Sequence, residues 1–180
     1  SVEARGNVQV VDFLQRATIK LSGNARTVYM PRNIEEFMTF YNIEHDKTAA
    51  LFYKAVHKRK IATHYADNNE AYSCYEYVSH YDENFKYEIG KKVSSNSFND
   101  DTREPCGCGI HISHKNWALD YGKDWENLAI LELKVKINDI LLPRCSGGKV
   151  RAPEAEVVRE VPLEECGMLG IINLKRRKTK

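Results

Sequence analysis

The residues best suited to chemistry lie close together between positions 106 and 114. Four of them are of types that coordinate zinc: Cys106, Cys108, His111 and His114. Structural zinc usually takes two ligand pairs from segments separated by a longer loop, so Cys145 or Cys166 would have to complete the set. Because neighbouring side chains of a strand point to opposite faces, four ligands this close do not readily surround one ion. A metal site is therefore the less favoured interpretation.

The same cluster contains a thiol that could act as a nucleophile. Cys108 lies three residues before His111, and a thiolate is activated by a nearby base or positive charge. Free cysteines are more often small buried hydrophobic residues, however. The chain has five cysteines, an odd number without a regular framework, which is typical of reduced thiols in a reducing compartment such as the cytoplasm. We interpret Cys106 and Cys108 as non-catalytic.

Two glycines precede His111, and a short helix is predicted after it. Residues 109–113 read as a strand, and Ser113 can cap a helix that runs through Tyr121. Gly122 is placed to end this helix in a left-handed turn. Because a residue without a Cβ allows close approach of the backbone, Gly107 and Gly109 suit a turn that contacts a flat ligand. The spacing predicts a strand–turn–helix unit beside a ligand site.

The stretch 107–122 resembles the central motif of ADP-ribosyltransferases, in which a Gly-x-Gly-Ile-Tyr strand leads to a helix with a small residue and a tyrosine. The resemblance implies NAD as cofactor, and His111 takes the position of the strand tyrosine that packs on nicotinamide. It also implies a late glutamate, Glu156, that stabilises oxocarbenium-like charge. Either Tyr53 or His57 would hold a ribose. The resemblance thus gives the catalytic candidates His111 and Glu156 and the cofactor-binding candidates Tyr53, His57, Gly107, Gly109 and Tyr121.

The remaining pattern predicts more strands than helices. A capping box, Asn33 followed by Glu36, predicts a helix over 33–41, and a second helix is predicted near 69–79. Apolar or alternating runs predict strands over 50–57, 85–90, 128–137 and 155–161, with a loop over 91–105. Because strands and helices are not regularly interleaved, we predict an α+β fold with an ADP-ribosyltransferase-like mixed or antiparallel sheet.

The first thirty residues read differently from the rest. Segments 6–10 and 23–28 each begin with Gly-Asn and continue as a short strand-like stretch. A segment of alternating polar and apolar residues, 17–21, lies between them. Short strands between Gly-Asn corners are typical of a β-solenoid, in which each coil packs on the next. We therefore predict the end of a solenoid-like segment over 1–30, with further coils before Ser1; a pair of ordinary hairpins is the alternative.

Three further parts complete the predicted organisation. A connecting helix and linker occupy 31–48, the α+β domain occupies 49–167, and a basic tail occupies 168–180. The last six residues carry five positive charges; since the net charge is +2, residues 1–174 sum to 2 − 5 = −3. Nucleic acid is therefore expected to contact only the tail, if any part. No apolar run approaches the roughly 20 residues that cross a bilayer, so no membrane partner is expected.

A longer series of segments is similar to a family of uncharacterised proteins of bacteriophages and prophages. The matching pieces, in order, are residues 22–26, 53–58, 87–91, 106–111, 118–122, 130–133, 148–151 and 158–162. The resemblance implies a phage accessory protein in the cytoplasm of a bacterial host. We predict that its domain binds an NAD-like nucleotide, with or without ADP-ribosyl transfer.

The alternative is a non-enzymatic module that binds a host or virion protein, or a second copy of itself. In that interpretation the contact surface is the tyrosine-rich segment 65–87, because tyrosine is enriched in protein interfaces.

Overall fold

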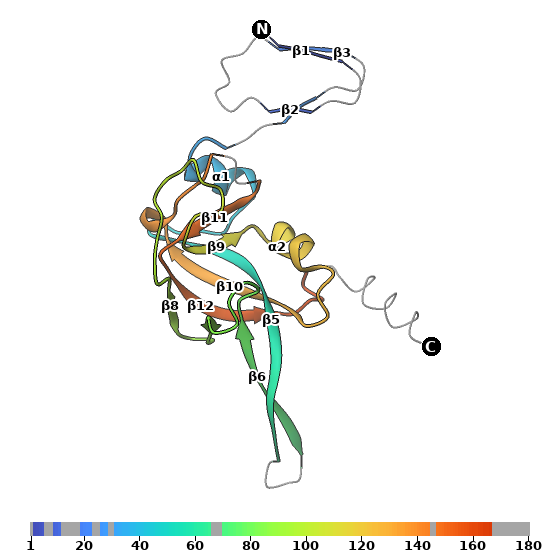
Figure 1. Cartoon of the computed structure of the whole chain (residues 1–180), viewed down its shortest axis with the longest axis vertical. Helices are drawn as coiled ribbons and strands as arrows, with labels where there is room; N and C mark the ends of the chain where they lie inside the picture. The colour runs from blue at the N-terminus through green and yellow to red at the C-terminus, as the bar shows by residue number, and fades with distance from the viewer. Residues whose placement is uncertain are drawn as a thin grey trace, which may run out of the picture. The chain divides into compact units, whose positions relative to one another are not determined.

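The computed structural model describes residues 2–5, 9–11, 19–22, 26–28, 31–65, 70–144 and 147–166 (Figure 1). The chain divides into two compact units, Ser1–Ile43 and Glu44–Lys180. Cys145 and the predicted basic tail lie outside the described residues.

Two separate pairs of parallel strands occur in the first unit. Strand β1 (Val2–Arg5) pairs with β3 (Ile19–Ser22), and β2 (Gln9–Val11) pairs with β4 (Arg26–Val28). A solenoid requires several coils stacked into one continuous sheet. The described strands instead form two distinct two-stranded sheets, so the predicted solenoid was wrong.

The first helix confirms the predicted capping signal. Helix α1 spans Ile34–Phe40, and the Asn33 side-chain oxygen accepts a hydrogen bond from the Glu36 amide at 2.9 Å. The Glu36 carboxylate binds the guanidinium of Arg32, four residues earlier.

The second unit is built on a nearly closed, barrel-like antiparallel sheet (Figure 1). Six strands form its continuous path in the order β11 (Lys149–Ala152), β9 (Ile110–Ser113), β5 (Ala49–Tyr65), β10 (Leu128–Lys136), β12 (Glu154–Val161) and β8 (Lys92–Ser94). The predicted α+β class with an ADP-ribosyltransferase-like sheet was therefore wrong. The described helices are two short α-helices and one 3₁₀ turn, η1 (Ile137–Asp139), so strands dominate the fold.

The helix predicted near 69–79 is a strand, β6 (Ala71–Val78). It pairs with the second half of β5 and, at its end, with β7 (Lys86–Tyr87). Tyrosine favours strands, and this segment contains three tyrosines, Tyr72, Tyr75 and Tyr77. Some of its less polar residues are spaced as in a helix, but they do not form a buried face in the structure.

The core lies where α2 (Lys115–Gly122) packs on the sheet. Ala55, Ala118, Leu119, Ile130 and Val161 form a buried cluster there. The helix begins after His114, one residue later than predicted. Gly122 does not end it in a left-handed turn; a Cβ at this position would lie 2.5 Å from a methyl carbon of Leu128 and 3.2 Å from the Ala55 Cβ. The glycine thus allows α2 to approach β5 closely.

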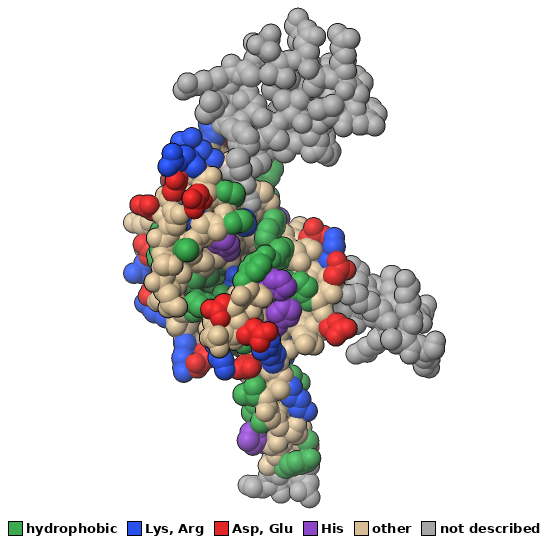
Figure 2. All heavy atoms as spheres, viewed as in Figure 1, with side chains coloured by type: hydrophobic (Ala, Val, Ile, Leu, Met, Phe, Trp, Pro, Cys, Tyr) green, Lys and Arg blue, Asp and Glu red, His purple; other side chains and the backbone are tan. Residues whose placement is uncertain are grey.

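Strand β5 is longer than predicted because it serves two partners. Residues 49–57 pair with β10, and residues 57–65 pair with β6 in a hairpin that extends from the barrel (Figure 1). We call residues 58–77 the arm. None of its described side chains is buried, and Figure 2 shows hydrophobic side chains on its surface. No helix among the described residues is long and apolar enough to cross a membrane.

Candidate functional site

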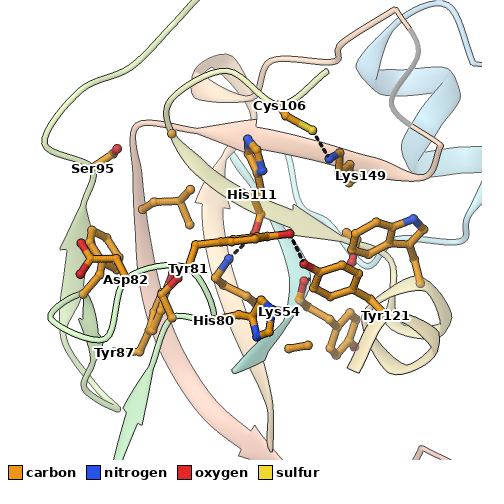
Figure 3. A pocket seen from close by; sticks show the side chains of 18 residues that line it. Lys54, His80, Tyr81, Asp82, Tyr87, Ser95, Cys106, His111, Tyr121 and Lys149 are labelled. Carbon is orange, nitrogen blue, oxygen red and sulfur yellow. Dashed lines mark hydrogen bonds between the residues drawn. The ribbon is translucent and has the colours of Figure 1, made fainter. Parts of the chain in front are cut away.

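A cavity of about 580 Å³ opens beside α2, between β5, β9 and the segment 79–85 (Figure 3). Its wall is rich in aromatic rings: Tyr53, Tyr81, Phe85, Tyr87, Trp117 and Tyr121. We call it the aromatic pocket. Its volume lies in the range typical of small-molecule sites.

Two tyrosine hydroxyls meet across the mouth of the pocket. The hydroxyl oxygens of Tyr81 and Tyr121 lie 2.6 Å apart, and Figure 3 shows the two side chains reaching toward each other. Tyr121 stacks on Trp117 at 5.0 Å between ring centroids, whereas Tyr81 is largely exposed. Burial and this hydrogen bond raise the pKa of Tyr121, so its phenol is neutral at ordinary pH. The contact ties the 79–85 segment to α2.

A stack of three rings holds the same segment from behind. His57 and His80 stack on Trp125 at 4.5 and 4.3 Å between centroids. Their ring nitrogens, Nε2 of His57 and Nδ1 of His80, lie 2.9 Å apart. Such a hydrogen bond needs at least one of the two rings to be neutral. Burial, and then the neighbouring His80, lower the pKa of His57, which keeps it uncharged at neutral pH.

Lys54 brings a positive charge to the pocket wall. Its Nζ donates to the His111 carbonyl oxygen at 2.9 Å, as the dashed line in Figure 3 shows, and lies 5.7 Å from the Tyr87 ring centroid. No described carboxylate forms an ion pair with it. Burial and the charge of Lys149 lower its pKa to about 8.

A second lysine of the pocket wall lies on β11. Lys149, at the start of β11, donates to the Cys106 sulfur at 3.0 Å and lies 6.0 Å from the Trp117 ring centroid. The described residues give it no carboxylate partner either. The pocket therefore presents two lysines whose charges are not balanced by an adjacent acid.

Arg151 fixes the loop that carries Cys106. Its guanidinium is fully buried and donates to the Asp101 and Glu104 carbonyl oxygens, both at 2.6 Å. Gly107 packs against this group, since a Cβ there would lie 2.6 Å from Arg151 Nη1. A buried guanidinium that binds backbone oxygens fixes the position of a loop without a salt bridge.

His111 holds the same loop from the pocket side. Its Nε2 lies 2.8 Å from the Gly107 carbonyl oxygen, which can only accept, so Nε2 carries the proton. Burial lowers the pKa of His111, and the ring is neutral.

The structure brings together four of the seven residues predicted for the site. Tyr53, Gly109, His111 and Tyr121 all line the aromatic pocket. Gly109 has a φ of +141°, so a side chain there would be strained.

The other three predicted residues lie elsewhere. Gly107 contacts Arg151, and His57 lies in the Trp125 stack behind the pocket. Glu156 is exposed on β12 and lines a different hollow, together with Lys92 and Lys136. His111 and Glu156, the two catalytic candidates, therefore do not share a cavity.

Several pocket residues were missed at the sequence level. Lys54 carried a signal, because it is the charged residue of an otherwise apolar run, 50–57. Lys149 follows a Gly-Gly turn, and no feature of the sequence marked it as a pocket residue. Tyr81 and Tyr87 belonged to the tyrosine-rich segment, which was assigned to a protein contact.

The predicted zinc alternative has no support in the geometry. In the described part of the chain, no three His, Cys, Asp or Glu side chains are grouped as a metal site. His111 is bonded to Gly107, and the His114 Nδ1 caps α2 by accepting from the Trp117 amide at 3.4 Å.

Comparison with known proteins gives one match. Residues 54–117 match a family of unknown function, DUF5758, over less than half of the chain. The matched segment begins at Lys54 and ends at Trp117, both of which line the aromatic pocket. Neither a curated protein nor a solved structure matches the chain.

Proposed function

We propose that the second unit binds a small, planar, negatively charged ligand of the nucleotide class in the aromatic pocket. One observation carries this proposal: the cavity combines an aromatic wall with Lys54 and Lys149, neither of which has a described carboxylate partner. A phosphate supplies the missing negative charge, and a base supplies a flat face for the rings.

The aromatic rings favour a planar ligand over an aliphatic one. Tyr81 and Tyr121 are joined only through their hydroxyls at the mouth, so a base entering between them would exchange one hydrogen bond for ring contacts. Stacking of a base on an aromatic side chain contributes about 1–3 kcal/mol. Asp82, which also lines the pocket, offers an acceptor for a sugar hydroxyl.

Binding is supported better than group transfer. An ADP-ribosyl transfer site needs an acidic group close to the bond that breaks. Glu156 lies in another hollow, and Glu132, which accepts from the Tyr53 hydroxyl at 3.4 Å, is buried and paired with Arg159. We therefore propose a binding function and no transferase activity. A small accessory domain of a bacteriophage protein would be compatible with it.

The test is a thermal-shift titration with NAD, ADP and adenosine. NAD or ADP should raise the melting temperature in a saturable way, since a ligand that binds only the native state stabilises it. Adenosine, which lacks phosphate, should shift it much less. The variants Lys54→Met and Lys149→Met should each weaken ADP binding by about tenfold, because each removes a charge-assisted hydrogen bond.

A matched control comes from the other hollow. Lys92 is an exposed lysine paired with Glu154, and Lys92→Met should leave ADP binding unchanged. No shift with millimolar NAD or ADP, in a protein that melts cooperatively, would refute the nucleotide proposal. If Lys92→Met weakened ADP binding equally, the effect of the pocket lysines would be one of general charge and not of a specific site.

A second candidate function is self-association through the arm. Tyr65, Tyr72 and Tyr75 are 72%, 55% and 45% exposed, and the outer edge of β6 before Tyr77 pairs with no other described strand. An open strand edge can add a strand from a second copy. Sedimentation over a range of concentrations tests this: a mass that rises toward a dimer and returns to that of the monomer in Tyr72→Ser/Tyr75→Ser supports it, and a constant monomer excludes it.

A further inference from the structure

The surroundings of Lys54 are less polar than binding of an anion alone would require. It lies in the middle of β5, where its cross-strand partner on β10 is the fully buried Leu131. The ionisable groups near its side chain are Lys149 on β11, His111 on β9 and Tyr87 on β7. Two of these are neutral and the third repels a positive charge.

We propose that Lys54 is a nucleophile that forms an imine with an aromatic aldehyde carrying an anionic group. The inference rests on the same pocket as the proposed nucleotide site, and it extends that function to a covalent ligand class. The aromatic wall would receive the ring of the aldehyde, and Lys149 would bind its anionic group.

The protonation state of Lys54 is compatible with this chemistry. An ammonium group has no lone pair, so a lysine attacks only as the free amine. With a pKa of about 8, Lys54 is unprotonated at pH 7 on the order of 100 times more often than an ordinary lysine. The bond to the His111 carbonyl does not prevent attack, because a neutral amine can donate one N–H and still present its lone pair.

The reaction balances without a further reactant. The ammonium first loses a proton to solvent, and the amine lone pair then forms a C–N bond to the aldehyde carbon. The carbonyl oxygen takes up a proton, and the nitrogen gives one up, so that a neutral carbinolamine results. The hydroxyl then leaves with the remaining proton of the nitrogen as water, and a C=N bond results. One amine and one aldehyde become one imine and one water, and the reaction needs no oxidant or reductant.

The test uses pyridoxal 5′-phosphate, a planar aromatic aldehyde with a phosphate. The folded protein is incubated with a limiting amount at pH 7, the imine is reduced with borohydride, and the modified lysines are identified by peptide mass. We expect Lys54 to be labelled at least tenfold more than exposed lysines such as Lys60. Labelling of Lys54 should level off above about pH 8, whereas that of exposed lysines should keep rising.

Two variants test the assignment of the label to Lys54. Lys54→Arg keeps the positive charge but cannot form the imine, so the label at this peptide should disappear. Lys60→Met, on the arm, should leave the labelling of Lys54 unchanged. Circular dichroism verifies that each variant is folded.

The possible outcomes are distinct. Label spread evenly over exposed lysines, or an unlabelled Lys54 in the folded wild type, overturns the imine proposal. If ADP binds in that case, the nucleotide site still stands. If Lys54 is labelled but neither NAD nor ADP binds, the imine proposal stands and the nucleotide proposal fails.

Discussion

At the scale of single residues, the charge of Lys54 has a cost that depends on pH. Its folded pKa, about 8, lies below the ordinary value of 10.5, so the unfolded chain binds its proton more tightly than the native state does. The resulting destabilisation is complete below pH 8 and disappears as the pH rises to 10.5. A half-buried lysine kept at this cost, in a cavity, is a candidate for function.

The variant Lys54→Met measures this cost. Wild type should gain stability relative to the variant by about 2–3 kcal/mol between pH 7 and pH 10.5, because only wild type sheds the penalty in this range. Urea unfolding followed by tryptophan fluorescence at several pH values gives the difference. Lys60→Met, at an exposed site, is the control. A difference for Lys54→Met that does not vary with pH would show that the lysine is well solvated.

Gly107 illustrates a glycine required by packing instead of by a ligand. A Cβ there would lie 2.6 Å from Arg151 Nη1 and 3.1 Å from the side-chain nitrogen of Asn99. Arg151 cannot yield without weakening its bonds to two carbonyl oxygens of the loop. Gly107→Ala should therefore lower the free energy of unfolding by about 1–3 kcal/mol.

Cys108→Ala, one residue away on the exposed side of the same loop, is the matched control and should change stability by less than about 0.5 kcal/mol. Both are measured by chemical denaturation. Equal stability of Gly107→Ala and wild type would mean that the loop shifts freely and that Arg151 does not fix it.

At the scale of elements, the His57–His80–Trp125 stack makes one side of the pocket sensitive to acid. Since the pKa of His57 is lowered in the folded state, stability is lost as the pH falls through the unfolded value of 6.5. The ionisable groups that face it are His80, Arg59 and Glu83. Two charged imidazoles cannot share the hydrogen bond that now joins them.

The variant His57→Phe keeps a flat ring on Trp125 but cannot be protonated. Between pH 7 and pH 5, wild type should lose more stability than the variant, because only wild type carries the ring whose pKa is lowered on folding. The pKa values of His111 and His114 are lowered as well, but both residues are present in both proteins and cancel in the difference. His57→Gln serves as a second variant if the phenylalanine does not fit. Parallel pH profiles would mean that the stack does not respond to protonation.

Local sequence patterns were enough to predict α1 and β10. Asn33 and Glu36 predicted α1 because a cap depends on adjacent residues, and the run 128–137 predicted β10 because a central strand is buried on both sides. Segment 71–78 was mispredicted although its partner, the second half of β5, directly precedes it in the chain, because its side chains show no regular burial pattern. A half-exposed strand on an arm has no alternation of burial to reveal it.

At the scale of the whole molecule, the site could be predicted only in part. Residues of the motif around His111 line one wall of the pocket, because β9 and α2 are adjacent in the chain. Glu156 was assigned by analogy to a fold that this chain does not have, and the barrel places it in another hollow. Lys149 and Tyr81 reach the pocket through the order of strands, which no single motif encodes.

The arm and the barrel should be separable, since the arm buries none of its described side chains. Arg59 and Glu76 are directly opposite on β5 and β6, so residues 60–75 can be replaced by Asn-Gly, which favours a two-residue hairpin turn. The trimmed protein should melt within about 5 °C of wild type, because the core cluster and the pocket wall are untouched. The shift produced by ADP should be retained, and any concentration-dependent increase in mass should be lost. A trimmed protein that does not fold would show that the arm contributes to the barrel, and a folded one that no longer binds ADP would place part of the ligand site on the arm.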